Sequence, residues 1–197
     1  MGISNPRLGP GQTPLSDEET LGLIPGYIST IGELNEWEYE NILKGQAWAM
    51  SGRRKDILTE KFIKVLHKRM FGDVWDWAGK YRTSNKNLGV PAYTISSELR
   101  EVLDTIRFWE EQETFDAREI AVRLHHRVVK VHPFANGNGR HSRLLADVFL
   151  HNRKRPVFSW GGGANLRWDS DKKQAYLDAL HEADNTDYRH LLQFAES

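Results

Sequence analysis

Residues 131–143 bring together side chains that can bind a phosphate group and react at it. The candidate residues in this stretch are His132, Gly137, Asn138, Gly139, Arg140 and Arg143. Glycines let the backbone approach an anion closely, and guanidinium groups can bind phosphate oxygens through two parallel hydrogen bonds. An imidazole can take a proton from an incoming hydroxyl near neutral pH. The stretch therefore predicts a site for chemistry at a phosphate.

The segments on either side of this stretch have the apolar spacing of α-helices. Residues 118–131 and 144–150 both follow it, so we expect a helix, a tight glycine-rich turn and a second helix. The first amides and the positive dipole end of the second helix would form an anion site with the turn. Arg140 and Arg143 lie three residues apart, so both can face one side of that helix. A Gly-Asn-Gly turn is also common as a plain helix end and loop, and alone it does not decide between the two.

Length and composition narrow the class of protein. The chain has 197 residues, which suits one compact domain. It has 27 basic and 27 acidic residues, so its overall charge does not favour direct binding to nucleic acid. It has no cysteine, which excludes disulfides, thiol catalysis and metals bound by cysteine. No apolar run approaches the roughly 20 residues of a membrane helix, so we expect a protein of the cytoplasm without membrane contact.

The sequence divides into an arm and one helical domain. Residues 1–28 are rich in glycine and proline and are expected to form an extended arm, with residues 29–197 as the domain. Helices are expected over 29–49, 56–71, from Ser96 or Ser97 to about residue 110, and over 118–131, 144–150, 169–183 and 186–195. His125 and His126 are adjacent on one helix, where neighbours point about 100° apart, and no carboxylate completes a metal site with them. We interpret both histidines as structural or surface residues.

The phosphate-binding stretch resembles the signature of the Fic family, which is His-x-Phe-x-(Asp or Glu)-Gly-Asn-Gly-Arg-x-x-Arg. The chain matches it at His132, Phe134, Gly137, Asn138, Gly139, Arg140 and Arg143, and Asn136 stands where the family has an acid. A second segment, residues 77–82, resembles the Trp-Ala-Gly-x-x-Arg segment upstream of that signature. The resemblance implies an all-α fold, a Fic helical bundle, with a small β-hairpin flap near the active site. Within the family, the chain resembles the single-domain bacterial members labelled mobile mystery protein B.

The resemblance also implies an activity, the transfer of AMP from ATP to a hydroxyl side chain of a target protein. It implies that His132 is the general base, that residues 137–139 form the anion hole, and that Arg140 and Arg143 hold the outer phosphates. The family's acid carries Mg²⁺, or Mn²⁺ in its place, and the amide of Asn136 is a weaker ligand for such a cation. Two alternatives therefore stay open: transfer of another phosphate-linked group, as in phosphorylation, or nucleotide binding without turnover.

Two further elements follow from the resemblance. The flap, residues 87–94, would hold the target segment by strand addition, and its candidate residues are Asn87, Leu88, Gly89, Val90, Tyr93 and Thr94. An ordinary connecting loop is the other interpretation of the flap. Ser29 and Glu33 partly match the family's inhibitory helix, which leads to the hypothesis that Glu33 pairs with Arg143. A favourable interaction of Glu33 with the dipole of its own helix would explain the acid equally well.

The expected partners are a target protein and, through self-modification, the chain itself. The expected location is the bacterial cytoplasm, and delivery into another cell remains compatible with the sequence.

Overall fold

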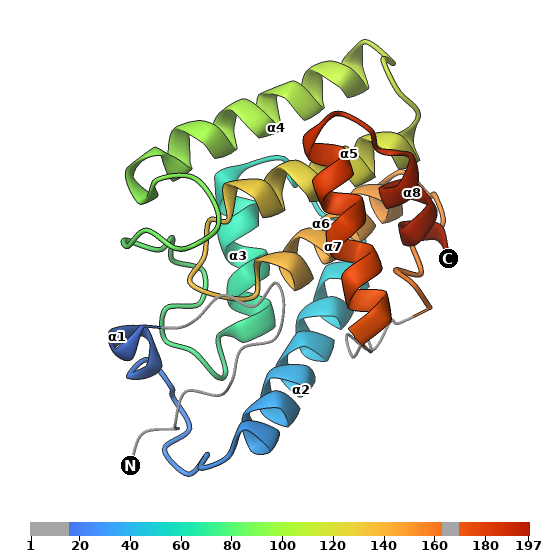
Figure 1. The fold of residues 1–197 in the computed structure, drawn as a ribbon. Coiled ribbons are helices and arrows are strands. Elements are labelled where there is room, and N and C mark those ends of the chain that lie inside the picture. The colour runs from blue at the N-terminus through green and yellow to red at the C-terminus, as the bar shows by residue number, and fades with distance from the viewer. Residues whose placement is uncertain (1–15, 163–169) are drawn as a thin grey trace.

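The computed structural model describes residues 16–162 and 170–197 and shows an α-helical protein (Figure 1). Its helices are α1 (Asp17–Thr20), α2 (Ile31–Met50), α3 (Glu60–Phe71), α4 (Ile95–Glu111), α5 (Ala117–Val131), α6 (Asn138–Asn152), α7 (Ser170–Asp184) and α8 (Arg189–Glu196), with a short 3₁₀ helix η1 (Ala92–Thr94). The predicted all-α class is confirmed. Among the described helices, none combines the length and the apolar character that crossing a bilayer requires.

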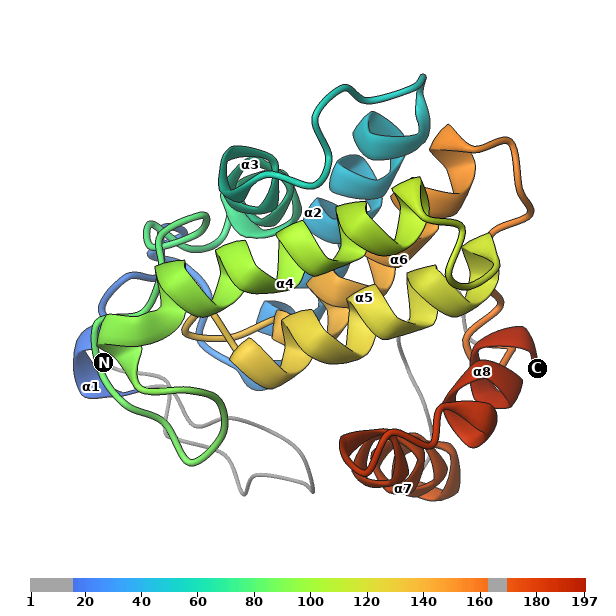
Figure 2. The ribbon, with the colours of Figure 1, turned by 90° about the horizontal axis from the view of Figure 1, so that it is seen from above.

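The centre of the fold is the antiparallel pair of α5 and α6, which the phosphate-binding stretch connects. Figure 2 shows α2 and α3 on one side of this pair and α7 and α8 on the other. Leu124 and Val128 of α5 and Leu145 and Phe149 of α6 are completely buried. Such interior side chains pack closely and make the pair rigid. The loop between α5 and α6 is therefore held at both ends by the core.

Helix starts follow the capping chemistry of the sequence in most places. Thr30 caps α2, Thr59 caps α3 and Asp116 caps α5, each through a side-chain oxygen that accepts a backbone N–H. The predicted start of the helix at residues 96–97 is wrong, because α4 begins at Ile95 and continues from η1 without a side-chain cap. A cap is unnecessary there, since the preceding 3₁₀ turn already directs the chain into the helix.

The described part of the predicted arm packs against the domain. Residues 22–24 pair with residues 74–76 in a short antiparallel contact, in which Ile24 N–H donates to Val74 O and Asp76 N–H donates to Gly22 O, both at 2.9 Å. Trp77 Nε1 donates to Glu19 O at 3.0 Å. The remainder of the arm, residues 1–15, lies outside the described residues.

The β-hairpin predicted for the flap is not confirmed. Residues 83–91 form bends without strand pairing and lead into η1. The Arg82 guanidinium donates to Ser84 O and Val90 O, and it thereby joins the two limbs of this loop. The Asn85 side chain accepts from Ala92 N–H at 2.9 Å. Side chains therefore occupy backbone groups that a hairpin would pair with each other.

Candidate active site

The loop between α5 and α6 is held in one shape by a buried asparagine. Asn138 Oδ1 accepts from Phe134 N–H and Asn138 Nδ2 donates to Phe134 O, both at 2.9 Å. Phe134 is completely buried, as an anchor of the loop would be. Asn138 was predicted to bind phosphate, but its side chain is used within the loop. What Asn138 offers to an anion is its backbone amide in the first turn of α6.

Gly137 lets α6 begin close against α3. It adopts a left-handed conformation, φ 77° and ψ 2°, at the N-cap position of α6. A Cβ atom at this position would lie 2.6 Å from Phe71 Cζ of α3. Both the positive φ and this close contact favour glycine. The helix start has no side-chain cap, and backbone amides at a helix N-terminus favour anions.

His67 of α3 is a second residue that holds the loop. Its Nδ1 accepts from Gly79 N–H and its Nε2 bonds to Asn136 O, each at 3.0 Å, and its ring stacks on Phe134 with centroids 3.7 Å apart. Burial holds the pKa of His67 well below its ordinary value, so the ring is neutral and donates from Nε2 to the carbonyl. His67 thus connects the Trp-Ala-Gly segment to the phosphate-binding loop, and sequence reasoning missed it because single helical histidines carry no signal.

His132 is buried and neutral at physiological pH. It is the C-cap of α5 in a left-handed conformation, φ 54° and ψ 59°, and 7% of its surface is exposed. Burial and then the charge of Arg82 lower its pKa to about 4, against which a hydrogen bond to the Val129 backbone acts. A neutral imidazole that donates from one nitrogen presents the other as a proton acceptor. His132 therefore has the protonation state that a general base requires.

The flap lies directly against His132. A Cβ atom at Gly89, where φ is 92°, would lie 2.5 Å from His132 Cβ. Val90 N–H donates to Val131 O at 3.3 Å, and Arg82 Nε donates to His132 O at 2.7 Å. Arg82 therefore links the flap to the backbone of the predicted base. This explains why the Trp-Ala-Gly-x-x-Arg segment accompanies the phosphate-binding stretch.

Several predicted flap residues are open to solvent. Tyr93 is 88% exposed and Leu88 is 45% exposed, and Asn87 and Gly89 are also exposed. Val90 and Thr94 are half-buried.

Arg140 is paired with an acid that sequence reasoning did not single out. Arg140 Nη1 donates to Glu38 Oε2 at 2.7 Å, and Trp75 Nε1 donates to Glu38 Oε1, also at 2.7 Å. Glu38 lies on α2 and is 8% exposed. The guanidinium of Arg140 also lies over the Phe71 ring, 4.9 Å from its centroid. Glu38 stands among other glutamates in a polar helix, so no local pattern distinguishes it.

Arg143 is buried beside α7. Its guanidinium carbon lies 5.3 Å from the centroid of the Tyr176 ring, and it hydrogen-bonds to the Tyr176 hydroxyl. The nearest acid that acts on it is Asp147, whose carboxylate accepts from Trp160 Nε1 at 3.1 Å and from Phe158 N–H at 3.2 Å. Burial raises the pKa of Asp147 to about 7, so this acid is partly protonated at neutral pH.

Glu33 does not pair with Arg143, which corrects the inhibitory hypothesis. Its carboxylate accepts from Ser29 N–H at 2.9 Å, Ser29 Oγ at 3.1 Å and Thr30 N–H at 3.0 Å. Glu33 and Thr30 form a capping box at the start of α2, and Glu33 is exposed. The hydrogen bond from the Ser29 backbone is the main cause that lowers its pKa. A helix N-terminus with unpaired amides holds the acid locally, as the alternative interpretation expected.

Asn136 does not fit the role of a metal ligand in this arrangement. Its side-chain Oδ1 accepts from Gly137 N–H at 2.5 Å, and its carbonyl bonds to His67. Within residues 16–162 and 170–197, no three His, Cys, Asp or Glu side chains cluster as a metal site would. At the position of the family's acid the chain therefore provides an amide and no carboxylate, so most of the ligands of a Mg²⁺ ion there would have to come from the nucleotide phosphates and water.

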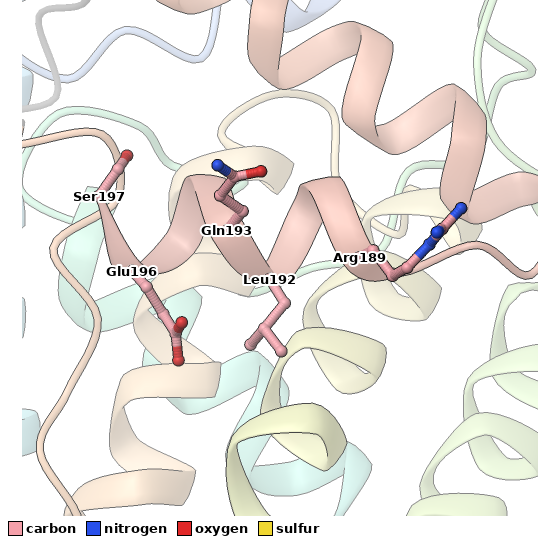
Figure 3. Close-up of a pocket in the computed structure, with 5 residues that line it drawn as sticks. All are labelled: Arg189, Leu192, Gln193, Glu196 and Ser197. Carbon is pink, nitrogen blue, oxygen red and sulfur yellow. The ribbon is translucent and has the colours of Figure 1, made fainter.

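A surface pocket of about 470 Å³ lies away from these residues, on α8 (Figure 3). Its lining residues are Arg189, Leu192, Gln193, Glu196 and Ser197. None of them was predicted to act in the site, and Glu196 pairs with Arg118 at 2.6 Å. This pocket therefore contributes nothing to the candidate active site.

The structure thus has an α-helical fold in which His132 ends α5, Gly137 begins α6, and Arg140 and Arg143 lie in the first turns of α6. Residues 57–150 match the model of the Fic/DOC family. The matched segment contains both stretches that predicted the resemblance to the Fic/DOC family, and this resemblance is confirmed.

Three known proteins illustrate the similarity. The chain is 27% identical over 199 residues to protein adenylyltransferase fic-1 of Caenorhabditis elegans, covering 98% of this chain and 37% of that protein. It is 33% identical over 128 residues to protein adenylyltransferase VbhT of Bartonella schoenbuchensis, covering 61% of this chain and 25% of that protein. The solved structure of BepC from Bartonella tribocorum, with bound AMPPNP, has a TM-score of 0.68 at 15% identity and covers 92% of this chain and 97% of that one. The chain thus spans less than two fifths of these two curated relatives.

Proposed function

We propose that this protein transfers AMP from ATP to a hydroxyl side chain of a target protein. The observation that supports it most directly is the neutral, buried His132 between the flap and the amides at the start of α6. The relatives named above are called adenylyltransferases, and BepC binds an ATP analogue. These similarities support ATP as the AMP donor.

The proposed reaction uses groups that the chain itself supplies. His132 takes the proton of the target hydroxyl, whose oxygen attacks the α-phosphorus of ATP. A phosphorus–oxygen bond forms to the target, the bond to the bridging oxygen breaks, and pyrophosphate leaves. The amides of residues 137–139 and the guanidiniums of Arg140 and Arg143 stabilise the charge that develops on the phosphates. Arg140 reaches this role only if its pairing with Glu38 permits contact with a phosphate.

The flap is the proposed docking surface for the target. Its residues Asn87, Leu88 and Gly89 are exposed beside His132, where a target hydroxyl must arrive. An extended target segment would place its side chain toward the base and its apolar neighbours on Leu88 and Tyr93. Segments of the chain itself that reach this surface would be modified in the same way.

Transfer of label from α-labelled ATP, with Mg²⁺ present, tests the proposal. His132→Ala is expected to lower the rate by a factor on the order of 10² to 10⁴, and His181→Ala, at an exposed residue of α7, is the matched control. Because the pKa of His132 is about 4, the rate should hold from pH 7 to about pH 5 and fall below that. Full activity of His132→Ala would refute the proposal.

Asn136 supports one alternative, nucleotide binding without transfer. Its amide is neutral and its Oδ1 is engaged by Gly137 N–H, so it offers little to a divalent cation. ATP binding by calorimetry without labelled product would favour this alternative, and Asn136→Asp should then restore transfer. Transfer of a phosphate-linked group other than AMP would appear as a different mass added to the modified protein.

A further inference from the structure

The hydroxyl of Tyr176 lies at the anion site although it comes from α7. A Cβ atom placed on Gly139 would lie 3.7 Å from the Tyr176 hydroxyl and 3.7 Å from Arg143 Nη1. Tyr176 is 6% exposed, and its ring packs against Phe194 of α8 with centroids 5.6 Å apart. A helix distant in sequence therefore places a polar group between the glycine turn and the second arginine.

The direction of the hydrogen bonds around Tyr176 follows from the chemistry of its neighbours. A guanidinium can only donate, so the phenol oxygen accepts from Arg143. The phenol then has one proton, and His125 Nε2 lies 3.1 Å from its oxygen. Burial keeps His125 neutral, so Nε2 can accept that proton. The three groups form a chain in which Arg143 donates to Tyr176 and Tyr176 donates to His125.

We propose that Tyr176 and His125 are positioning residues that hold Arg143 toward the outer phosphates of a bound nucleotide. This inference rests on the proposed function of the site. It makes α7 part of the nucleotide site and gives His125 a role beyond packing.

A neutral partner suits a guanidinium that must bind an anion. A buried N–H needs an acceptor, and a carboxylate would satisfy it but would also neutralise the guanidinium charge. The phenol oxygen of Tyr176 satisfies an N–H and leaves the positive charge of Arg143 in place. Arg140 shows the opposite arrangement, since it is paired directly with the Glu38 carboxylate.

The chain contains a matched control for this arrangement. Tyr188 bonds to His126 Nδ1 at 3.1 Å and is also buried. The guanidinium carbon of Arg123 lies 4.1 Å from the centroid of its ring. Tyr188 thus has the same kinds of neighbour as Tyr176, but its arginine is not part of the phosphate-binding stretch.

Calorimetric binding of ATP, ADP and AMP to the full chain tests the inference. Tyr176→Phe removes only the hydroxyl and is expected to weaken binding of ATP and ADP about 5- to 10-fold, the effect of one lost hydrogen bond. AMP lacks the outer phosphates, so its affinity should stay within about 2-fold. Tyr188→Phe should leave all three affinities unchanged, and circular dichroism melting of both variants controls for folding.

Variants of His125 distinguish positioning from packing. His125→Gln keeps an acceptor near the position of Nε2 and should restore most of the ATP affinity that His125→Leu loses. Equal effects of Tyr176→Phe and Tyr188→Phe, or equal weakening for ATP and AMP, would overturn the inference. These measurements need no transfer, so a chain that binds ATP selectively but transfers nothing would refute the proposed function and leave the positioning role standing.

Discussion

Two adjacent histidines of α5 each bond to a tyrosine, but they serve different regions of the molecule. His125 bonds to Tyr176 and His126 bonds to Tyr188, both at 3.1 Å. The first pair reaches Arg143 and the anion site. The second lies at the edge of the domain, where His126 Nε2 also contacts Asp184 Oδ1 at 3.2 Å.

The difference between the pairs comes from helix geometry rather than from residue type. Neighbouring side chains on a helix point about 100° apart, so His125 meets Tyr176 within α7, whereas His126 meets Asp184 at the end of α7 and Tyr188 just before α8. Arg143 lies beside one tyrosine and Arg123 beside the other. The two histidine–tyrosine pairs therefore have the same chemistry but different roles, because each pair faces a different part of the molecule. Breaking each pair in turn tests this conclusion.

The largest difference between the two regions is expected at their arginines, because only Arg143 belongs to the phosphate-binding stretch. Lysine has a single ammonium and cannot bind two phosphate oxygens in the forked geometry of arginine. Arg143→Lys should therefore lower kcat/KM for labelled ATP by about 10²-fold, the order of effect for one group that stabilises the transition state. Arg123→Lys should leave kcat/KM unchanged and cost about 1 kcal/mol of stability through its weaker contact with the aromatic rings. Equal losses of activity would contradict the division between the two regions.

Acid stability should also separate the two histidines. The pKa of His125 is held well below its ordinary value by burial, whereas for His126 the effect of burial is opposed by the charge of Asp184. The unfolded chain takes up protons first as the pH falls below about 6.5, so each histidine contributes stability that is present above this pH and is lost below it.

Urea unfolding at pH 7.5 and pH 5 measures this difference. A histidine that titrates only in the unfolded chain changes stability by at most about 1.4 kcal/mol per pH unit. His125→Asn should flatten the dependence of unfolding free energy on pH more than His126→Asn does. A steeper curve for His125→Asn, or a larger flattening for His126→Asn, would show that Asp184 does not protect the charged form of His126.

The sequence predicted what depends on local chemistry. The spacing of apolar residues indicated α5 and α6, and the residues of the signature stretch indicated the anion site between them. Thr30 and Glu33 could be recognised as a helix cap because both partners lie within one turn. Long-range partners could not be predicted in this way. Glu38 of α2 and Tyr176 of α7 meet their arginines only after both helices have packed against α6.

The flap is a second case in which a long-range contact could not be predicted from local sequence. Its extended residues and turn residues favoured a hairpin, but Arg82 donates to backbone carbonyls of both limbs. Strand propensity depends on context more than helix propensity does. A single long side chain was enough to decide the local conformation, and nothing within residues 87–94 reports its presence.

Two of the glutamates of α2, Glu38 and Glu33, show the same contrast between a residue inside the site and one outside it. Glu38 is buried against Arg140, and Glu33 is exposed in the helix cap. Glu38→Gln keeps one acceptor oxygen for its two donors, Arg140 and Trp75, and removes a negative charge beside Arg140. ATP binding should tighten about 5-fold, on the order of 1 kcal/mol, and AMP binding should change less. Weaker binding of both nucleotides would show instead that the charge of Glu38 is needed to place Arg140.

Glu33→Gln should have the smallest effect and should act on stability alone. Glutamine preserves the capping box but loses the favourable interaction of a charge with the helix dipole. Hydrogen bonds from the Ser29 and Thr30 backbones lower the pKa of Glu33 below its ordinary value of 4.5. The charged carboxylate therefore stabilises the fold at pH values above 4.5, and this stabilisation is lost as the pH falls and the carboxylate is protonated. The urea midpoint of the variant should lie slightly below that of the wild type at pH 7, and the two should converge below pH 4.5. A gain in nucleotide affinity or transfer in Glu33→Gln would instead connect this cap to the active site.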